Sequence, residues 1–450
     1  MPEPSSSNLL RSFERPWAPA ENPKSILLTN ASLVDTKNST VHKNSSISLR
    51  NGRITEVCYA GHQLSAKEHD YVVDLRGKFL CPGLIDCHVH VTATPGDIKF
   101  SALYDRWQST ILMRTSYILR KMLLRGFTTV RDTGGCDAGI RDAVAESLIA
   151  GPRLFIAGLA LSQTGGHADF RAPHHGQAHK CCGELMSIGR ICDGVPACLE
   201  ATRDELRKGA DFIKIMLGGG LATPTDPLHM LQFTPEEIRA ITTTAMYSGT
   251  YVTAHAYTPD SIRHAVDNGV KGIEHANLID LDTAEYCVER GIIFTPTLAT
   301  YNSYFFPPFG DAIPEQSKGK LEEVLAAGKN SLRILKEAGA QICYGSDLLG
   351  GAHYMQSRGF ALTAEVFSSA EVLRSATTNA AKLLRMEDKI GVLEAGYTAD
   401  VLILDKNPLE DVSVLDLPEV FLSVIKEGRV VSSRLVDLPI DGLYGAIQDS

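Results

Sequence analysis

Six polar side chains in this sequence each stand at or near the end of a short apolar run. They are His88, His90, Lys214, His255, His275 and Asp347. Imidazole nitrogens and carboxylate oxygens are the usual protein ligands of zinc and similar divalent cations. If the six side chains converge around one opening, they form a single ligand set. The pattern therefore predicts a metal site.

The spacing of His88 and His90, two residues apart, places both imidazoles on the same face of a β-strand. A single buried histidine is more often a hydrogen-bonded core residue than a metal ligand. A buried lysine is rarer, because an ammonium group without a partner is costly to bury. Six such residues at the ends of separate runs are hard to explain as independent accidents, which favours metal binding over a structural role.

A repeating pattern between residues 81 and 385 contains these six residues. Apolar, strand-like runs alternate there with stretches typical of helices, such as 234–249, which opens with an N-terminal helix signal. The runs cover residues 83–91, 127–134, 153–161, 211–217, 251–257, 272–276, 292–299 and 341–347. Eight strand–helix repeats predict an α/β fold, a (β/α)8 TIM barrel, with active-site residues at the C-terminal ends of its strands.

The two ends of the chain have a different texture. Residues 25–80 and 386–450 contain short alternating runs typical of strands, and Asn51-Gly52 is a hairpin-turn signal. Each piece is too small to close a core alone, so we expect one small β-sandwich domain made from both. Residues 1–24 have no apolar segment and are predicted to be a disordered leader rather than a signal peptide.

Composition excludes several classes of protein. The net charge is −9 and there is no long Lys/Arg run, which argues against nucleic-acid binding. No apolar run reaches the ~18–20 residues of a membrane span. The 10 cysteines are scattered, without a Cys-x-x-Cys pair, which favours reduced thiols in a cytoplasmic protein.

Several of these segments together resemble the metal-dependent amidohydrolase superfamily. The matching segments are 82–90, 212–216, 253–257, 273–280, 344–347 and the tail 390–412. Segments 160–171, 213–227 and 254–262 are similar to the branch that contains Xaa-Pro dipeptidase-like and N-acyl-amino-acid hydrolases and the fungal ochratoxin amidase. His-x-His alone is a weak signal, whereas the combination is specific.

This resemblance implies two divalent metal ions and a carboxylated lysine. An ammonium group has no lone pair, so Lys214 becomes a ligand only as a CO2-derived carbamate that bridges both ions. By the same resemblance, His88, His90 and Asp347 hold one ion, and His255 and His275 hold the other. The ions then share a hydroxide, and Asp347 is the catalytic residue that moves its proton to the leaving amine. Zinc suits these ligands; manganese, cobalt and iron are compatible.

Three further residues are candidate substrate contacts. Tyr257 lies on the same strand face as His255 and has a phenolic proton to donate; core packing is its alternative role. His167 lies in a glycine-containing loop that can reach the site. His353 follows Asp347 closely, and a surface role is equally compatible with its position. Arg131 and Asp132 are expected to form a structural ion pair below the site.

Two segments leave alternatives open. Between His167 and Cys182 the chain is rich in histidine and cysteine, but it lacks the paired Cys-x2–4-Cys spacing of structural zinc sites. A lid or insertion is favoured there, with a second metal site as the alternative. The aromatic stretch 301–306 suits either a pocket for an aromatic acyl group or an oligomer contact.

The predicted function is hydrolysis of an amide bond in an N-acyl amino acid or dipeptide-like small molecule, a class that includes substrates with an aromatic, ochratoxin-like acyl group. Lactone or ester hydrolysis, or decarboxylation, by the same metal centre is the alternative. A non-catalytic scaffold predicts gaps in the ligand set, and none is present. No nucleic-acid or membrane partner is expected, whereas a homo-oligomer is.

Overall fold

The computed structural model describes residues 17–19, 22–60, 64–96, 106–171, 187–223, 225–312 and 318–444. Every one of the eight predicted barrel runs contains a strand. These strands are β6 (Leu84–Val89), β7 (Phe127–Asp132), β8 (Arg153–Ile156), β11 (Ile213–Met216), β12 (Val252–Ala256), β13 (Gly272–His275), β14 (Ile293–Thr295) and β15 (Gln341–Ile342). Two further short strands, β9 (Ala160–Ser162) and β10 (Gly189–Ile191), pair beside β11.

Neighbouring strands of the barrel pair in parallel. One sheet contains β6-β7-β8 and the other contains β10-β9-β11-β12-β13-β14-β15. Backbone hydrogen bonds join the two sheets to each other at both places where they meet. Asp211 N donates to Ile156 O and Cys87 N donates to Tyr344 O, each at 2.8 Å. All strands therefore end at one mouth, which confirms the TIM-barrel prediction and brings their C-terminal residues together.

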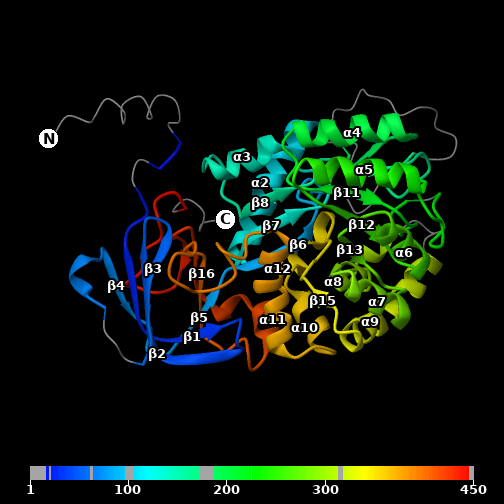
Figure 1. Ribbon diagram of the computed structural model, residues 1–450. Helices are drawn as coiled ribbons and strands as arrows, with labels where there is room; N and C mark the ends of the chain where they lie inside the picture. The colour runs from blue at the N-terminus through cyan, green and yellow to red at the C-terminus, as the bar shows by residue number, and fades with distance from the viewer. Residues whose placement is uncertain are drawn as a thin grey trace.

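Helices surround this barrel (Figure 1). They are α2 (Gln108–Leu124), α3 (Ala138–Ala145), α4 (Val195–Arg207), α5 (Pro235–Tyr247), α6 (Pro259–Asp267), α7 (Leu281–Glu289), α8 (Leu298–Ser303), α9 (Lys318–Glu337), α10 (Arg358–Ala364), α11 (Ser369–Ser375) and α12 (Thr378–Leu383), with short 3-10 turns that include η7 (Gly350–Met355). The predicted start of α5 is confirmed by a capping box between Thr234 and Glu237. Within the described ranges, no helix is long and apolar enough to cross a bilayer.

Strands from both ends of the chain lie together beside the barrel, in blue and red in Figure 1. They are β1 (Ile26–Asp35), β2 (Thr40–Arg50), β3 (Arg53–Cys58), β4 (Tyr71–Asp74), β5 (Phe79–Pro82), β16 (Val401–Leu404), β17 (Phe421–Lys426) and β18 (Arg429–Ser433). The predicted union of the termini is confirmed, but the two-layer sandwich is not. Because β5 pairs with both β1 and β16, these strands form one 8-stranded sheet.

Candidate metal centre

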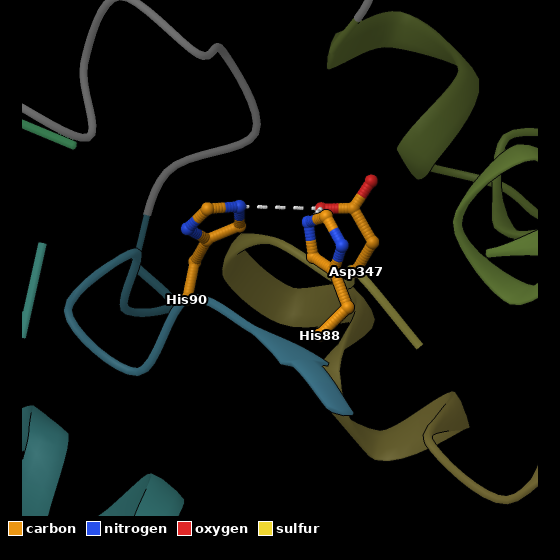
Figure 2. A group of neighbouring side chains, drawn as sticks. All are labelled: His88, His90 and Asp347. Carbon is orange, nitrogen blue, oxygen red and sulfur yellow. Dashed lines mark ion pairs between the residues drawn. The ribbon is translucent and has the colours of Figure 1, made fainter. Parts of the chain in front are cut away.

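All six predicted metal-site residues line one cavity at the mouth of the barrel. They are His88, His90, Lys214, His255, His275 and Asp347. Figure 2 shows the rings of His88 and His90 turned toward the carboxylate of Asp347. One ligand atom from each of these three residues lies within 4.8 Å of the other two. The structure thus assembles a three-residue group, with the other three residues on the walls of the same cavity.

The carboxylate of Asp347 faces three imidazoles. Its Oδ1 lies 3.3 Å from Nε2 of His88 and 3.4 Å from Nε2 of His90, and its Oδ2 lies 3.9 Å from Nδ1 of His275. Burial alone would raise the pKa of Asp347, but the neighbouring imidazoles of His88 and His90 hold that pKa well below its usual value. The group is therefore a carboxylate, which suits a cation ligand.

An unusual backbone conformation aims two of the six side chains. His275 and Asp347 have φ angles of 75° and 54°, in the left-handed region that few non-glycine residues adopt. Adjacent side chains on a strand normally point to opposite faces. Glu274 and His275 are adjacent, yet Glu274 bonds to His88 inside the barrel and His275 also lines the cavity. The change of direction at His275 lets both adjacent side chains reach the centre.

Partners at Nδ1 orient three of the imidazoles. Nδ1 of His88 lies 2.7 Å from Glu274 Oε2, that of His90 lies 2.8 Å from Gly134 O, and that of His275 lies 2.7 Å from Thr297 Oγ1. Such partners fix the ring and leave Nε2 for a cation. His255 differs, because its Nε2 lies 3.2 Å from Gly219 O. Burial lowers the pKa values of His255 and His275 well below the usual value, so both rings are neutral.

Lys214 is the least expected residue of the cavity. Its side chain is 1% exposed, and among the residues that the structure describes, no hydrogen bond or ion pair reaches its amine. Burial lowers the pKa of Lys214 to about 8. A buried ammonium without a partner is costly, whereas a neutral amine is less so and is also a nucleophile.

Comparison with known proteins agrees with this arrangement. The model of the amidohydrolase family matches residues 79–431. The chain belongs to the amidohydrolase family. Ochratoxinase from Aspergillus niger is 30% identical over 364 residues, which cover 78% of this chain and 75% of that protein. This membership, together with that relative, makes the chain a hydrolase that acts on carbon–nitrogen bonds.

Solved structures of similar proteins share the fold. The crystal structure of an amidohydrolase is 42% identical and has a TM-score of 0.88, covering 91% of this chain and 100% of that chain. The crystal structure of a prolidase complexed with N-methylphosphonate-L-proline is 39% identical, with a TM-score of 0.87 and the same coverage, 91% and 100%. Amidohydrolases generally bind divalent metals, and the group of His88, His90 and Asp347 offers a cation nitrogen and oxygen donors.

Arg131 and Asp132 do not form the ion pair predicted from the sequence. Arg131 Nη2 donates instead to Glu274 Oε1 at 2.6 Å, and both side chains are 0% exposed. Asp132 accepts backbone hydrogen bonds from Val91, Gly134 and Cys136. The prediction was wrong because adjacent residues of a strand point to opposite faces. Glu274 was missed, although a carboxylate inside an apolar run was a visible signal.

Of the three predicted substrate contacts, two line the cavity and one does not. Tyr257 and His167 line the metal cavity, and the His167 ring stacks on His255 with 4.0 Å between ring centres. His353 is buried in η7, where its Nε2 lies 3.0 Å from Ala93 O, and it is not among the residues that line the cavity. Its position favours a structural link between two loops over a substrate contact.

The histidine- and cysteine-rich segment lies mostly outside the described residues. Only its first part, up to Arg171, is described, so neither the lid nor the second metal site predicted for it is tested. The described part shows His167 held by an acidic partner, since Nδ1 lies 2.8 Å from Asp226 Oδ2. Asp226, which sequence reasoning missed, is fully buried.

Proposed function

We propose that this chain is a binuclear metal-dependent hydrolase that cleaves the amide bond of an N-acyl amino acid or a dipeptide-like substrate. One observation supports this most directly: Lys214 is buried in the cavity that is also lined by five imidazoles and Asp347, and no described residue forms a hydrogen bond or ion pair with its amine. A purely structural lysine would have an acceptor. A lysine that reacts with CO2 needs an amine that can lose its proton.

Carboxylation would turn Lys214 into a ligand. The neutral amine nitrogen attacks the carbon of CO2, a proton leaves the nitrogen, and the product is a carbamate with two oxygen donors. In this proposal His88, His90 and Asp347 would hold one cation, His255 and His275 would hold the other, and the carbamate of Lys214 would supply further oxygen donors. Zinc suits this mixture of nitrogen and oxygen donors.

Two bound divalent cations supply an activated water at neutral pH and polarise the substrate carbonyl. The protein's own part is proton transfer. Asp347 is a carboxylate in contact with both halves of the ligand set, so it is placed to accept the proton of the attacking water. The same group then returns that proton to the nitrogen of the leaving amine, which completes cleavage of the amide.

The chain's own residues also suggest how substrate is oriented. Tyr301 OH donates to Tyr257 OH at 2.9 Å, which leaves the proton of Tyr257 free for an acceptor in the cavity. Burial raises the pKa of Tyr257 well above its usual value, so the phenol keeps that proton. His167 donates from Nδ1 to Asp226, and its other ring nitrogen remains for substrate. The Tyr257 hydroxyl therefore suits a carbonyl or carboxylate oxygen of the substrate, whereas the second ring nitrogen of His167 suits a donor of the substrate.

Replacing Tyr257 by Phe tests this contact. Loss of one hydrogen bond to substrate is expected to raise KM about tenfold with kcat changed less than threefold, because such a bond contributes about 1–1.5 kcal/mol. Steady-state kinetics with an N-acyl amino acid measures both constants. Tyr286→Phe, which removes the hydroxyl of a half-buried tyrosine bonded to Asp267 outside the cavity, is the matched control. An unchanged KM in Tyr257→Phe would exclude the contact.

Metal removal tests the function as a whole. Dialysis against a chelator is expected to lower amide hydrolysis more than 100-fold, and Zn2+ with bicarbonate is expected to restore it. Matched amide, ester and lactone substrates then show which bond is preferred; faster cleavage of lactones or esters would favour the alternative function. Full activity in protein with less than about 0.1 metal ion per chain would contradict the proposal.

A further inference from the structure

A buried carboxylate lies on the far side of one predicted metal ligand. Glu274 is 0% exposed and uses both of its oxygens. Its Oε2 accepts from Nδ1 of His88 at 2.7 Å, while its Oε1 accepts from Arg131 at 2.6 Å and from the hydroxyl of Thr253. Because both oxygens have hydrogen-bond partners, the carboxylate has little freedom to turn away from His88.

Arg131 completes this connection from another strand. Its guanidinium is 0% exposed, donates from Nε to Cys87 O at 2.6 Å and lies 5.0 Å from the ring centre of Phe212. Its Nη2 lies 2.6 Å from Glu274 Oε1, so the two fully buried side chains form an ion pair. Arg131 therefore keeps Glu274 ionised where an unpaired carboxylate would be too costly.

His88 is distinguished from the other ligands by this partner. The corresponding atoms of His90 and His275 meet neutral oxygens, Gly134 O and Thr297 Oγ1. Within the described part of the chain, Glu274 is the one carboxylate within hydrogen-bonding distance of the Nδ1 of a predicted ligand, since Asp347 Oδ2 lies 3.9 Å from Nδ1 of His275. A carboxylate can only accept, so this nitrogen must carry a proton, and the lone pair of the ring is left on Nε2.

We propose that Glu274 and Arg131 are positioning residues that keep the proton of His88 on Nδ1 and so commit Nε2 to the cation shared with His90 and Asp347. The inference rests on the proposed function for the presence of that cation. A negatively charged acceptor also makes the imidazole a stronger donor than its neighbours. The site of His88 is thus built for tight binding by residues that never touch the cation.

Glu274→Gln is the direct test. The glutamine amide has nearly the same shape as the carboxylate but only one acceptor oxygen. If that oxygen keeps its bond to Arg131, the NH2 group faces Nδ1 of His88. Nδ1 must then accept a hydrogen bond, so the imidazole proton moves to Nε2. The affinity for the first equivalent of Zn2+, measured by competition with a chelating indicator in the presence of bicarbonate, is expected to fall about 10–100-fold. Glu205→Gln is the matched control, because Glu205 is also buried and bonded to an arginine, Arg190, outside the centre. It is expected to stay within about threefold of the wild type.

A second measurement needs no stable variant at position 274. In the zinc-loaded wild-type protein with 15N-labelled histidine, the His88 ring, assigned by the signal lost in His88→Gln, is expected to be protonated at Nδ1 and metal-bound at Nε2. Protonation at Nε2, or equal zinc affinity in Glu274→Gln and Glu205→Gln, would overturn the positioning role. If the wild type itself bound no metal, the proposed function would fail first, so the two failures are distinguishable.

Discussion

Lys214→Met is expected to abolish amide hydrolysis and, at the same time, to stabilise the metal-free chain. The side chain of Lys214 is 1% exposed, and no acceptor among the described residues meets its amine. Methionine fills a similar volume without a charge, so the free energy of unfolding at pH 7 is expected to rise by about 1–3 kcal/mol. Activity is expected to fall at least about 1000-fold, because the carbamate ligand proposed for Lys214 can no longer form.

The two effects are measured on separate samples. Urea unfolding of the metal-free protein gives the stability, and hydrolysis after reconstitution with Zn2+ and bicarbonate gives the activity. Lys426→Met is the matched control, because Lys426 is also buried but has an ion-pair partner in Glu427, 3.8 Å away, in the terminal sheet. That variant should keep its activity and gain no stability. A Lys214→Met protein that is active, or that is less stable than the wild type, would contradict the assignment.

The stability gain also has a predicted pH dependence. Burial lowers the pKa of Lys214 to about 8 in the folded chain, against 10.5 for an unperturbed lysine. Below pH 8 both states of the wild type carry the proton, so the full cost of burying the charge is present. Between pH 8 and 10.5 only the unfolded state binds the proton, and wild-type stability rises with pH. The advantage of the methionine variant should therefore shrink across this window.

The gathering of the six predicted ligands in one cavity was predictable because their positions follow from strand periodicity. An imidazole or carboxylate at the end of an apolar run is visible in sequence, and a parallel barrel brings all such ends to one mouth. Contacts between side chains on strands that are not neighbours in the barrel were not predictable. The pairing of Arg131 with Glu274 joins two strands that are not neighbours, and the choice of partner depends on which face each side chain takes. The neighbour Asp132 was therefore assigned to Arg131 wrongly.

Local backbone geometry was the second limit. The pattern places Glu274 and His275 on opposite faces of a strand, but φ of 75° at His275 brings both to the centre. Nothing in the residue types signals that conformation. For the termini, alternation predicted the strands, but the β-sandwich expected from them was not confirmed. That outcome depends on the pairing of β5 with β1 and β16, which is set by tertiary contacts.

Asp347→Asn is expected to lower kcat about 1000-fold or more while much of the bound metal is retained, because general acid–base groups contribute about 10²–10⁴-fold. The amide oxygen of Asn can still coordinate a cation, but the group can no longer accept a proton and return it to the amine. Measuring kcat and metal content on the same reconstituted sample separates the two roles. Asp137→Asn is the control, since asparagine caps α3 as well as aspartate does.

The backbone conformation at residue 347 tolerates this substitution. Asp347 has a φ of 54°, and asparagine is one of the few residues that tolerate such a conformation. The variant therefore adds no backbone strain, and its side chain has nearly the same size as the original. A loss of kcat with metal still bound must then come from the carboxylate that faces His88, His90 and His275. If kcat stays within about tenfold of the wild type, another group carries the proton.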